Sequence, residues 1–308
     1  MTGPGEGTYY AHRLRRKLGR GEFVRYFEGS VAKCIERFKM FKKGDVVLVA
    51  VSGGKDSLAL LYSLHSLRQE LGVEVKALTL DLGIPSYSDE AVTLVRKHCE
   101  ALGVDHIVVS LKEEYGFSLP EAAKAGKLRR PICSLCGVIK RYVMNKVGVE
   151  LGADVMATGH NLNDLTQFMM LSLFSGRLED LPKLTPYSPG VKGLLTAKAK
   201  PLAFLYEDEA LSYVKALGLN YVKGPCPYRP KAGLQVAIRE ALDQLERKEP
   251  CSLYNFALSA VKRLIPSLNV ASEDLRRCKV CGMPSKGEVC SFCRIRERIG
   301  LNRSLGQD

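Results

Sequence analysis

The sequence predicts an α/β protein with a doubly wound, mostly parallel sheet. Residues 46–51 form a continuous apolar, β-branched run, which is typical of a strand buried on both faces. A Gly-rich turn and leucines at helical spacing follow, and strand and helix patterns then alternate along the chain. Further strands are expected at 75–81, 106–110 and 154–158, and helices from about Ser57, from Ser88 as a cap, and from about Gly137. The loops after residues 51, 81 and 158 should share one crevice, because ligands of such sheets bind beyond the carboxyl ends of the strands.

The chain is expected to divide into four segments. The first, 1–44, is rich in Lys and Arg and should form a basic helical arm over the core rather than part of it. The main domain should span 45–232 and carry the crevice. A helical extension is expected at 233–270, followed by a short, Cys-rich, basic module at 271–308.

Charge points to a polyanionic partner such as RNA. The sequence has 46 Lys and Arg against 33 Asp and Glu, a formal net charge of +13, and released counterions would contribute to affinity. The plainer interpretation is a basic surface without a partner. Basic residues just before the first cysteine pair could receive RNA phosphates: Lys127, Arg129 and Arg130.

The composition excludes a membrane-spanning protein. No window approaches the roughly 18 consecutive apolar residues that a membrane helix needs, and the N-terminus lacks an apolar signal core. We therefore expect a cytoplasmic protein. Ten cysteines in a reducing compartment favour metal or sulfur chemistry over disulfides.

The turn after the first strand has the composition of a phosphate loop and reads Ser52-Gly53-Gly54-Lys55-Asp56-Ser57. Its glycines let backbone N–H groups approach phosphate oxygens, and the following helix points its positive end at the same place. Lys55 adds a full charge, the serines add hydroxyl donors, and Asp56 could orient Lys55 or hold Mg²⁺. The pattern matches the Ser-Gly-Gly-x-Asp-Ser loop of the ATP pyrophosphatases, which cleave ATP between the α and β phosphates. The alternative is a Gly-rich turn without chemistry.

Three cysteines form the second candidate site. Cys133 and Cys136 open the helix predicted near 137, and Lys140 lies one turn further along the same face. A helix N-terminus and a nearby lysine favour the thiolate. Cys226 lies between two prolines that stiffen its loop. Three thiolates could hold an iron–sulfur cluster with one iron left open, but spacing alone equally allows a redox disulfide, a structural zinc or buried thiols.

Taken together, the motifs resemble the tRNA 2-thiouridine synthetases of the TtuA and NcsA type. The resemblance rests on the phosphate loop, on Pro-Ile-Cys-Ser-Leu-Cys-Gly, on Gly159-His160-Asn161 and on a late Gly-Pro-Cys-Pro, and it covers about residues 30–300. It implies an adenine nucleotide α-hydrolase-like sheet that binds ATP and Mg²⁺. Gly159, His160 and Asp81 are expected beside the nucleotide, although Asp81 could equally be a plain strand-end carboxylate.

The resemblance also implies a site for sulfur transfer. In that family a 4Fe–4S cluster is held by three cysteines, which match Cys133, Cys136 and Cys226. ATP would adenylate the uridine C2 oxygen, and sulfur would then attack C2 and expel AMP. Lys55 would offset the charge of pyrophosphate, while the family's functional lysine and aspartate carry over onto Lys140 and Asp164. The expected partners are tRNA, a thiocarboxylated ubiquitin-like carrier protein or sulfide as sulfur donor, and a second copy in a homodimer.

Some positions depart from the family. Asn163 stands where the family carries the first of two aspartates, Leu165–Gln167 replaces a usual Glu-Ala pair, and the N-terminal zinc module is absent. Two alternatives therefore remain. One is a tRNA 2-thiocytidine synthetase, which usually lacks a C-terminal zinc module. The other is a degenerate paralogue that binds tRNA and ATP without turnover.

The C-terminal module carries two further cysteine pairs: Cys278, Cys281, Cys290 and Cys293. Four thiolates in two pairs suit tetrahedral Zn²⁺, and a segment with so little core would depend on zinc to fold. Basic residues in the module could contact RNA, or it could be a structural clip with a solvated face; these residues are Arg276, Arg277, Arg294, Arg296 and Arg298.

Overall fold

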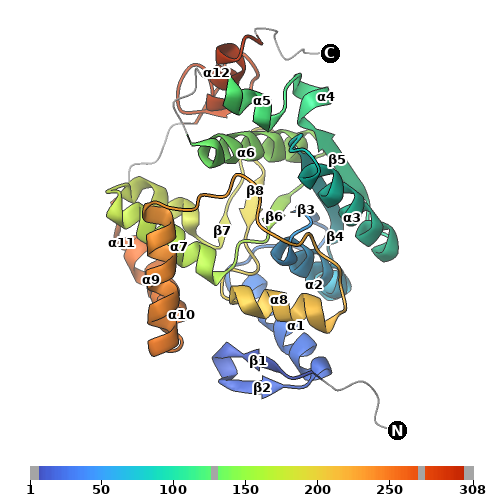
Figure 1. Ribbon diagram of the computed structural model, residues 1–308, viewed down its shortest axis with the longest axis vertical. Coiled ribbons are helices and arrows are strands. Elements are labelled where there is room, and N and C mark those ends of the chain that lie inside the picture. The colour runs from blue at the N-terminus through green and yellow to red at the C-terminus, as the bar shows by residue number, and fades with distance from the viewer. Residues whose placement is uncertain (1–6, 126–130, 270–274, 302–308) are drawn as a thin grey trace.

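A six-stranded sheet forms the centre of the molecule (Figure 1). The computed structural model describes residues 7–125, 131–269 and 275–301. The strands lie in the order β5-β4-β3-β6-β8-β7, and β7 alone among them runs antiparallel to its neighbour. Their bounds are β3 Val46–Ala50, β4 Glu74–Asp81, β5 His106–Ser110, β6 Val155–Thr158, β7 Tyr187–Ser188 and β8 Ala197–Ala199. The doubly wound, mostly parallel sheet is confirmed, and the chain order reverses between β3 and β6, which is where such sheets are expected to form their ligand crevice.

Helices cover both faces of the sheet, because the central strands are apolar on both faces, as in the continuous apolar run of β3. One face, with Val47 and Val49, packs against α1, α2, α3, α7 and α8; the other, with Leu48 and Met156, packs against α6 and two short helices. The bounds are α2 Lys55–Leu71, α3 Tyr87–Leu102, α4 Leu111–Tyr115, α5 Leu119–Lys124, α6 Ile132–Glu150, α7 Leu162–Phe174 and α8 Glu207–Ala216, with a 3₁₀ segment at Leu178–Leu184.

Two predicted helix starts are wrong. The helix expected from about Gly137 begins at Ile132, so both cysteines of the first pair lie inside its first turns. Ser88 does not cap α3, which follows Ser86; instead the Ser88 hydroxyl accepts a hydrogen bond from the backbone N–H of Ile84 at 3.1 Å. This bond steadies the turn that follows β4.

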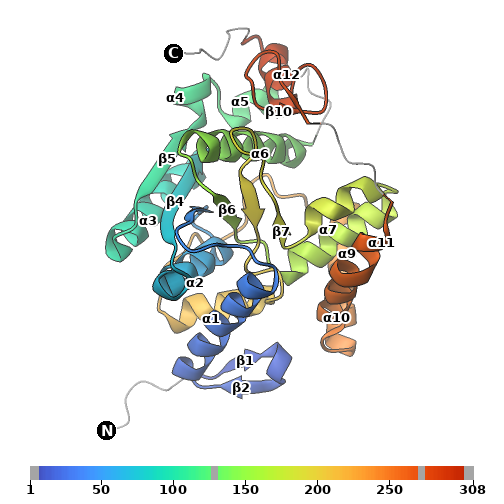
Figure 2. The same ribbon diagram turned by 180° about the vertical axis from the view of Figure 1, so that it is seen from behind.

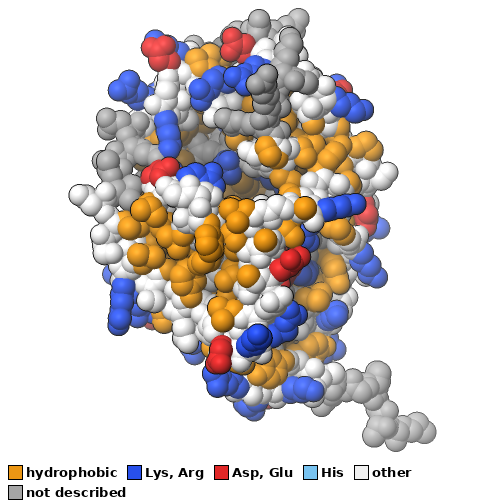
Figure 3. Space-filling view, turned by 60° about the vertical axis from the view of Figure 1, so that its left-hand side comes forward, with side chains coloured by type: hydrophobic (Ala, Val, Ile, Leu, Met, Phe, Trp, Pro, Cys, Tyr) orange, Lys and Arg blue, Asp and Glu red, His pale blue; other side chains and the backbone are white. Residues whose placement is uncertain are grey.

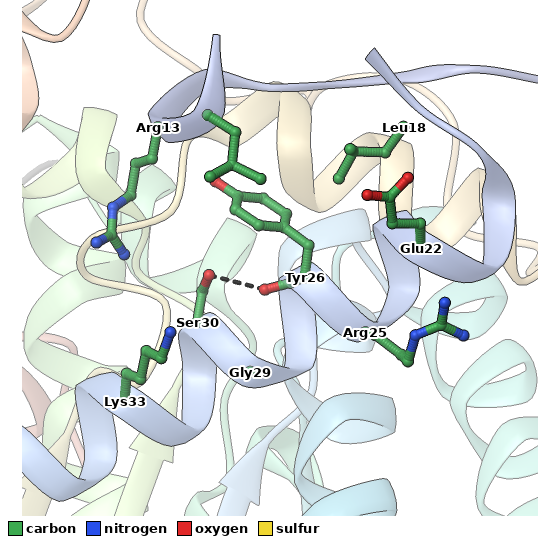
Figure 4. A pocket seen from close by; sticks show the side chains of 9 residues that line it. Arg13, Leu18, Glu22, Arg25, Tyr26, Gly29, Ser30 and Lys33 are labelled. Carbon is green, nitrogen blue, oxygen red and sulfur yellow. Dashed lines mark hydrogen bonds between the residues drawn. The ribbon is translucent and has the colours of Figure 1, made fainter. Parts of the chain in front are cut away.

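The N-terminal segment belongs to the core more than its charge suggests. A hairpin of β1 (Tyr9–Ala11) and β2 (Arg16–Leu18), joined by a 3₁₀ turn at His12–Leu14, leads into α1 (Arg20–Arg37). Phe23, Phe27 and Val31 of α1 are fully buried in the main cluster, since they recur at helical spacing. A hollow of about 410 Å³ separates the hairpin from α1 and is lined partly by basic side chains (Figure 4).

The C-terminal quarter forms two parts. Helices α9 (Leu234–Lys248), α10 (Ser252–Ser259) and α11 (Ile265–Ser267), with a π turn at Ala260–Leu264, continue the chain, and α9 and α10 pack on α7. The Cys-rich module has β9 (Arg276–Arg277), β10 (Pro284–Ser285) and α12 (Ser291–Arg298), and it docks on α6 (Figure 2). In the face shown in Figure 3, Lys and Arg side chains gather around a hollow. No helix in the described part of the chain is long and apolar enough to cross a membrane.

Candidate nucleotide and metal sites

The phosphate loop connects β3 to α2 as its composition predicts. Gly53 has a φ of 76°, which favours glycine, and a Cβ there would lie 3.0 Å from Val222 Cγ2. Ser57 braces the turn, because its hydroxyl accepts from the N–H of Ser52 at 3.1 Å and donates to the Gly54 carbonyl at 2.9 Å. No side chain caps α2, so the N–H groups of its first turn point into the crevice. These groups are placed to bind phosphate oxygens.

The loop after β6 lies directly on the phosphate loop. A Cβ at Gly159 would approach the Asp56 carbonyl to 2.9 Å, so only glycine fits there without displacing backbone. Asn161 donates from Nδ2 to Asp56 Oδ1 at 3.1 Å and fixes that carboxylate. The tertiary fold thus joins two motifs more than a hundred residues apart, and it gives Gly159 a packing role next to the nucleotide crevice.

Lys55 is oriented by Asp56, as the sequence suggested, and by a wider network of ion pairs that the sequence did not reveal. Its Nζ lies 2.7 Å from Asp56 Oδ2 and 2.7 Å from Oε1 of Glu207, at the start of α8. Arg239 of α9 pairs with the other oxygen of Glu207 and with Asp243, where Nε and Oδ1 are 3.2 Å apart. Burial by itself would lower the pKa of Lys55, but the two carboxylates outweigh it and raise the pKa. Lys55 therefore stays charged and pre-positioned in the crevice.

Asn163 and Asp164 start α7 on the other side of this network. Asn163 accepts the N–H of Glu207 on Oδ1 at 3.0 Å and donates from Nδ2 to Asp243 Oδ1 at 3.5 Å. The Asp164 carboxylate accepts the N–H of Asn161 in a capping box, and burial raises its pKa. The amide at 163 therefore satisfies a donor and an acceptor that one carboxylate could not satisfy together.

His160 and Asp81, which the sequence predicted beside the nucleotide, each have a local hydrogen-bond partner. His160 follows β6, and its Nδ1 lies 2.8 Å from Thr158 Oγ1. Its side chain is open to the crevice. The protein around the ring nevertheless removes part of its hydration, and nearby cations, of which Lys200 has the largest effect, repel a proton; together they lower the pKa of His160 to about 4. His160 is thus a neutral imidazole at pH 7. Asp81 accepts the N–H of Gly83 on Oδ1 at 2.7 Å and closes the turn after β4.

The three cysteines of the second candidate site lie close enough for their charges to interact. Cys133 and Cys136 lie in the first turns of α6, and the Cys133 thiol donates to the Tyr228 carbonyl at 3.0 Å, in the loop that carries Cys226. Burial raises the pKa of Cys133 and of Cys136; a charge on Cys226 raises both further, whereas Lys140 lowers both. As thiolates, these three side chains would repel one another, and the single cation Lys140 would offset part of that charge. A donor set of this kind fits a positively charged cluster. The basic residues Lys127, Arg129 and Arg130 lie outside the described residues.

The four C-terminal cysteines form a tighter set. Their Sγ atoms all lie within 4.8 Å of one another, and within the described ranges no other Cys, His and carboxylate group meets this spacing. Backbone N–H groups of Cys290 and Cys293 point at Sγ of Cys278 and Cys290 at 3.2 and 3.4 Å. Hydrogen bonds among these thiols lower the pKa of Cys281 and raise that of Cys293. The set fits one tetrahedral ion, and the first three cysteines are spaced more widely than the ligands of a single ion.

One aromatic side chain of the module, Phe292, packs into the main domain through several ring contacts. Phe292 is almost fully buried and stacks on Tyr142 of α6, with ring centroids 3.8 Å apart and planes inclined by 5°. Tyr115 meets the same ring edge-on at 5.1 Å. Helix α6 therefore carries Cys133 and Cys136 at its start and the Cys-rich module along its side.

A family model described as the PP-loop domain matches residues 26–230. The chain belongs to the PP-loop family. This PP-loop protein is 36% identical over 285 residues to a tRNA-5-methyluridine(54) 2-sulfurtransferase of Pyrococcus horikoshii, with 92% of this chain and 89% of the relative covered. It is 38% identical to the enzyme of the same name from Thermus thermophilus, with 92% and 86% covered.

A solved structure supports the same grouping. The PP-loop protein superimposes on the U34-tRNA thiolase NcsA from Methanococcus maripaludis, described with its 4Fe–4S cluster, with a TM-score of 0.82. Sequence identity is 28%, and 97% of this chain and 96% of the other are covered. The resemblance to the TtuA and NcsA type is thereby confirmed over almost the whole chain.

Proposed function

We propose that this PP-loop protein is an ATP-dependent tRNA thiolase that converts a uridine to 2-thiouridine. One observation carries the proposal: the field of Lys140 reaches both His160, at the phosphate-loop crevice, and the thiols of Cys133 and Cys136. The nucleotide crevice and the three-cysteine site are therefore neighbours. On this proposal, a nucleotide activated in one reacts with sulfur delivered in the other.

The first stage is adenylation. The uridine C2 oxygen attacks the α-phosphate of ATP, the bond to the β-phosphate breaks, and pyrophosphate leaves. Lys55 and the N–H groups at the start of α2 offset the negative charge that builds up. Burial raises the pKa of Asp56, and the charge of Asp164 raises it further. These two carboxylates would hold Mg²⁺ against the phosphates.

The second stage replaces oxygen by sulfur. A sulfur nucleophile attacks C2, the C2–oxygen bond breaks, and AMP carries the oxygen away. Cys133, Cys136 and Cys226 would hold a 4Fe–4S cluster, which when bound supplies an open iron for the sulfur. Lys140 stabilises the negative charge on the reacting centre or moves a proton there. The donor is a thiocarboxylated ubiquitin-like protein or sulfide, and the protein works as a homodimer in the cytoplasm.

The C-terminal module completes the proposal. Cys278, Cys281, Cys290 and Cys293 bind zinc, which supplies folding energy that the small module lacks. Its docking on α6 keeps the start of that helix in place. A 2-thiocytidine synthetase is the less favoured alternative because this module is well formed, and Asn163 does not favour a non-catalytic paralogue because the amide meets its partners.

The test is an anaerobic assay of the reconstituted full chain with unmodified tRNA, ATP and sulfide. We expect AMP and 2-thiouridine, read by mass spectrometry at both positions 34 and 54, for which similar enzymes are named. Lys140→Met and Cys133→Ser should lose the product, whereas Cys251→Ser, outside both cysteine sets, should keep it. Thiolated cytidine would establish the first alternative. An intact cluster with no thiolated product would establish the second.

A further inference from the structure

A second basic site lies between the Cys-rich module and the sheet. Its pocket has a volume of about 310 Å³, with one wall from α6 and β8 and the other from the module. In Figure 1, α12 lies above α6, and β8 lies below it. Module residues at the pocket include Met283, Ser291 and Arg294, while the main domain contributes Arg141 and Lys198.

Strand geometry directs Lys198 into this pocket. It pairs in register with Met156, which packs beneath α6, so Lys198 projects to the α6 side of the sheet while Ala197 and Ala199 face the main cluster. Arg141 reaches the same space from α6. A lysine in a strand otherwise flanked by buried alanines is not explained by core packing.

The side chains of these two cations have no partner in the described part of the protein. Across residues 7–125, 131–269 and 275–301, neither the Arg141 guanidinium nor the Lys198 ammonium makes a side-chain hydrogen bond or an ion pair. Burial lowers the pKa of both side chains, and each is near other charges: Arg141 lowers the pKa of Lys198 further, and the carboxylate of Asp180 partly offsets the effect on Arg141. Arg141 keeps solvent-accessible surface because it faces the pocket.

Two neighbouring cations of like charge repel each other, and an anion bound between them removes that repulsion. A guanidinium and an ammonium that converge on one space of this size match a phosphodiester group. The pocket has an apolar side as well, because Met283, Leu195 and Phe292 line it. Phosphate next to apolar surface is the composition of a nucleotide unit in RNA.

We propose that this pocket binds a backbone phosphate of the tRNA, with Arg141 and Lys198 as its ligands and the Cys-rich module as its outer wall. The inference rests on the proposed function and adds a binding site to it. The module thereby acts as half of an RNA site, beyond its role as a clip. Helix α6 connects this site to the first cysteine pair, five residues before Arg141 on the same helix.

The experiment compares Arg141→Met, Lys198→Met and the double variant with the full-length protein. Lys215→Met is the matched control, since Lys215 is an exposed residue of α8 and the net charge changes equally. Binding of an unmodified tRNA transcript is measured by fluorescence anisotropy at several salt concentrations. Each single variant should bind about tenfold more weakly, and the slope of log K against log salt should fall by about 1. The thermal midpoint of the free variants should be equal or higher, because one of two mutually repelling charges has been removed.

Every outcome of this experiment either supports or overturns the inference. If the variants bind tRNA as the control does while the wild type thiolates tRNA, the inference fails and the proposed function stands. If the wild type binds no tRNA, both fail. If affinity for ATP falls instead of affinity for tRNA, the pocket belongs to the nucleotide site and the inference is overturned. Weaker binding with a lowered midpoint in both single variants would show a structural role only and would also overturn it.

Discussion

Replacing Asn163 with Asp should destabilise the protein through repulsion from Asp243. The new carboxylate could still accept the N–H of Glu207, but its second oxygen would face Asp243 Oδ1 at the present 3.5 Å separation. Two unit charges at that distance repel by about 5 kcal/mol at an effective dielectric constant of about 20. Asp243 is 40% exposed and pairs with Arg239, so screening should reduce the loss to about 1–2 kcal/mol.

A double-mutant cycle with Asp243→Asn tests this value. Because the chain has no tryptophan, unfolding in urea is followed by far-ultraviolet circular dichroism. The pair Asn163→Asp/Asp243→Asn should recover most of the lost stability, giving a coupling energy of about 1–2 kcal/mol. Asn255→Asp, on the exposed side of α10, adds the same charge and should change stability by less than about 0.5 kcal/mol. An Asn163→Asp variant as stable as the wild type, or no recovery in the double variant, would refute the reasoning.

Three further outcomes are expected. Cys226→Ser should drop iron from about four atoms per chain to near none while about one zinc remains, as elemental analysis of anaerobically purified protein would show; loss of both metals would contradict two separate sites. Phe292→Ala should lower the free energy of unfolding by about 3 kcal/mol, against little change for Leu245→Ala on the exposed face of α9. The unfolding midpoint should fall as pH drops from about 6.5 towards 4, because the folded-state pKa of His160, about 4, lies below its ordinary 6.5 and the unfolded chain takes up the proton first. His160→Gln should flatten that part of the profile, and an unchanged profile would remove His160 as the cause.

The sequence predicted the main strands because each combines a continuous apolar run with flanking turn residues. It missed β7 and β8, which have two and three residues and are too short to show a period. Lys198 in the middle of β8 further hides that strand from a hydrophobic pattern. The start of α6 was placed five residues late, since the polar cysteine pair resembles a loop more than the first turns of a helix.

How well the sequence predicted a set of metal ligands depended on how far apart its members lie along the chain. The four C-terminal cysteines lie within sixteen residues and come together as their spacing indicates. Cys226 lies more than ninety residues after Cys133, and only the family resemblance indicated that the two belong to one site. The contact between the Cys133 thiol and the Tyr228 carbonyl now supports it.

The sequence by itself determined the phosphate loop, because glycine conformation, the serine brace and the helix start all act within six residues of chain. Only the tertiary structure decided what surrounds Lys55. Glu207 and Arg239 are ordinary charged residues in amphipathic helices, and their pairing depends on how α8 packs on α2 and how α9 packs on α7. Local backbone preferences can be read residue by residue, whereas the partner of a charge is set by the packing of distant apolar faces, which the charged residues themselves do not encode.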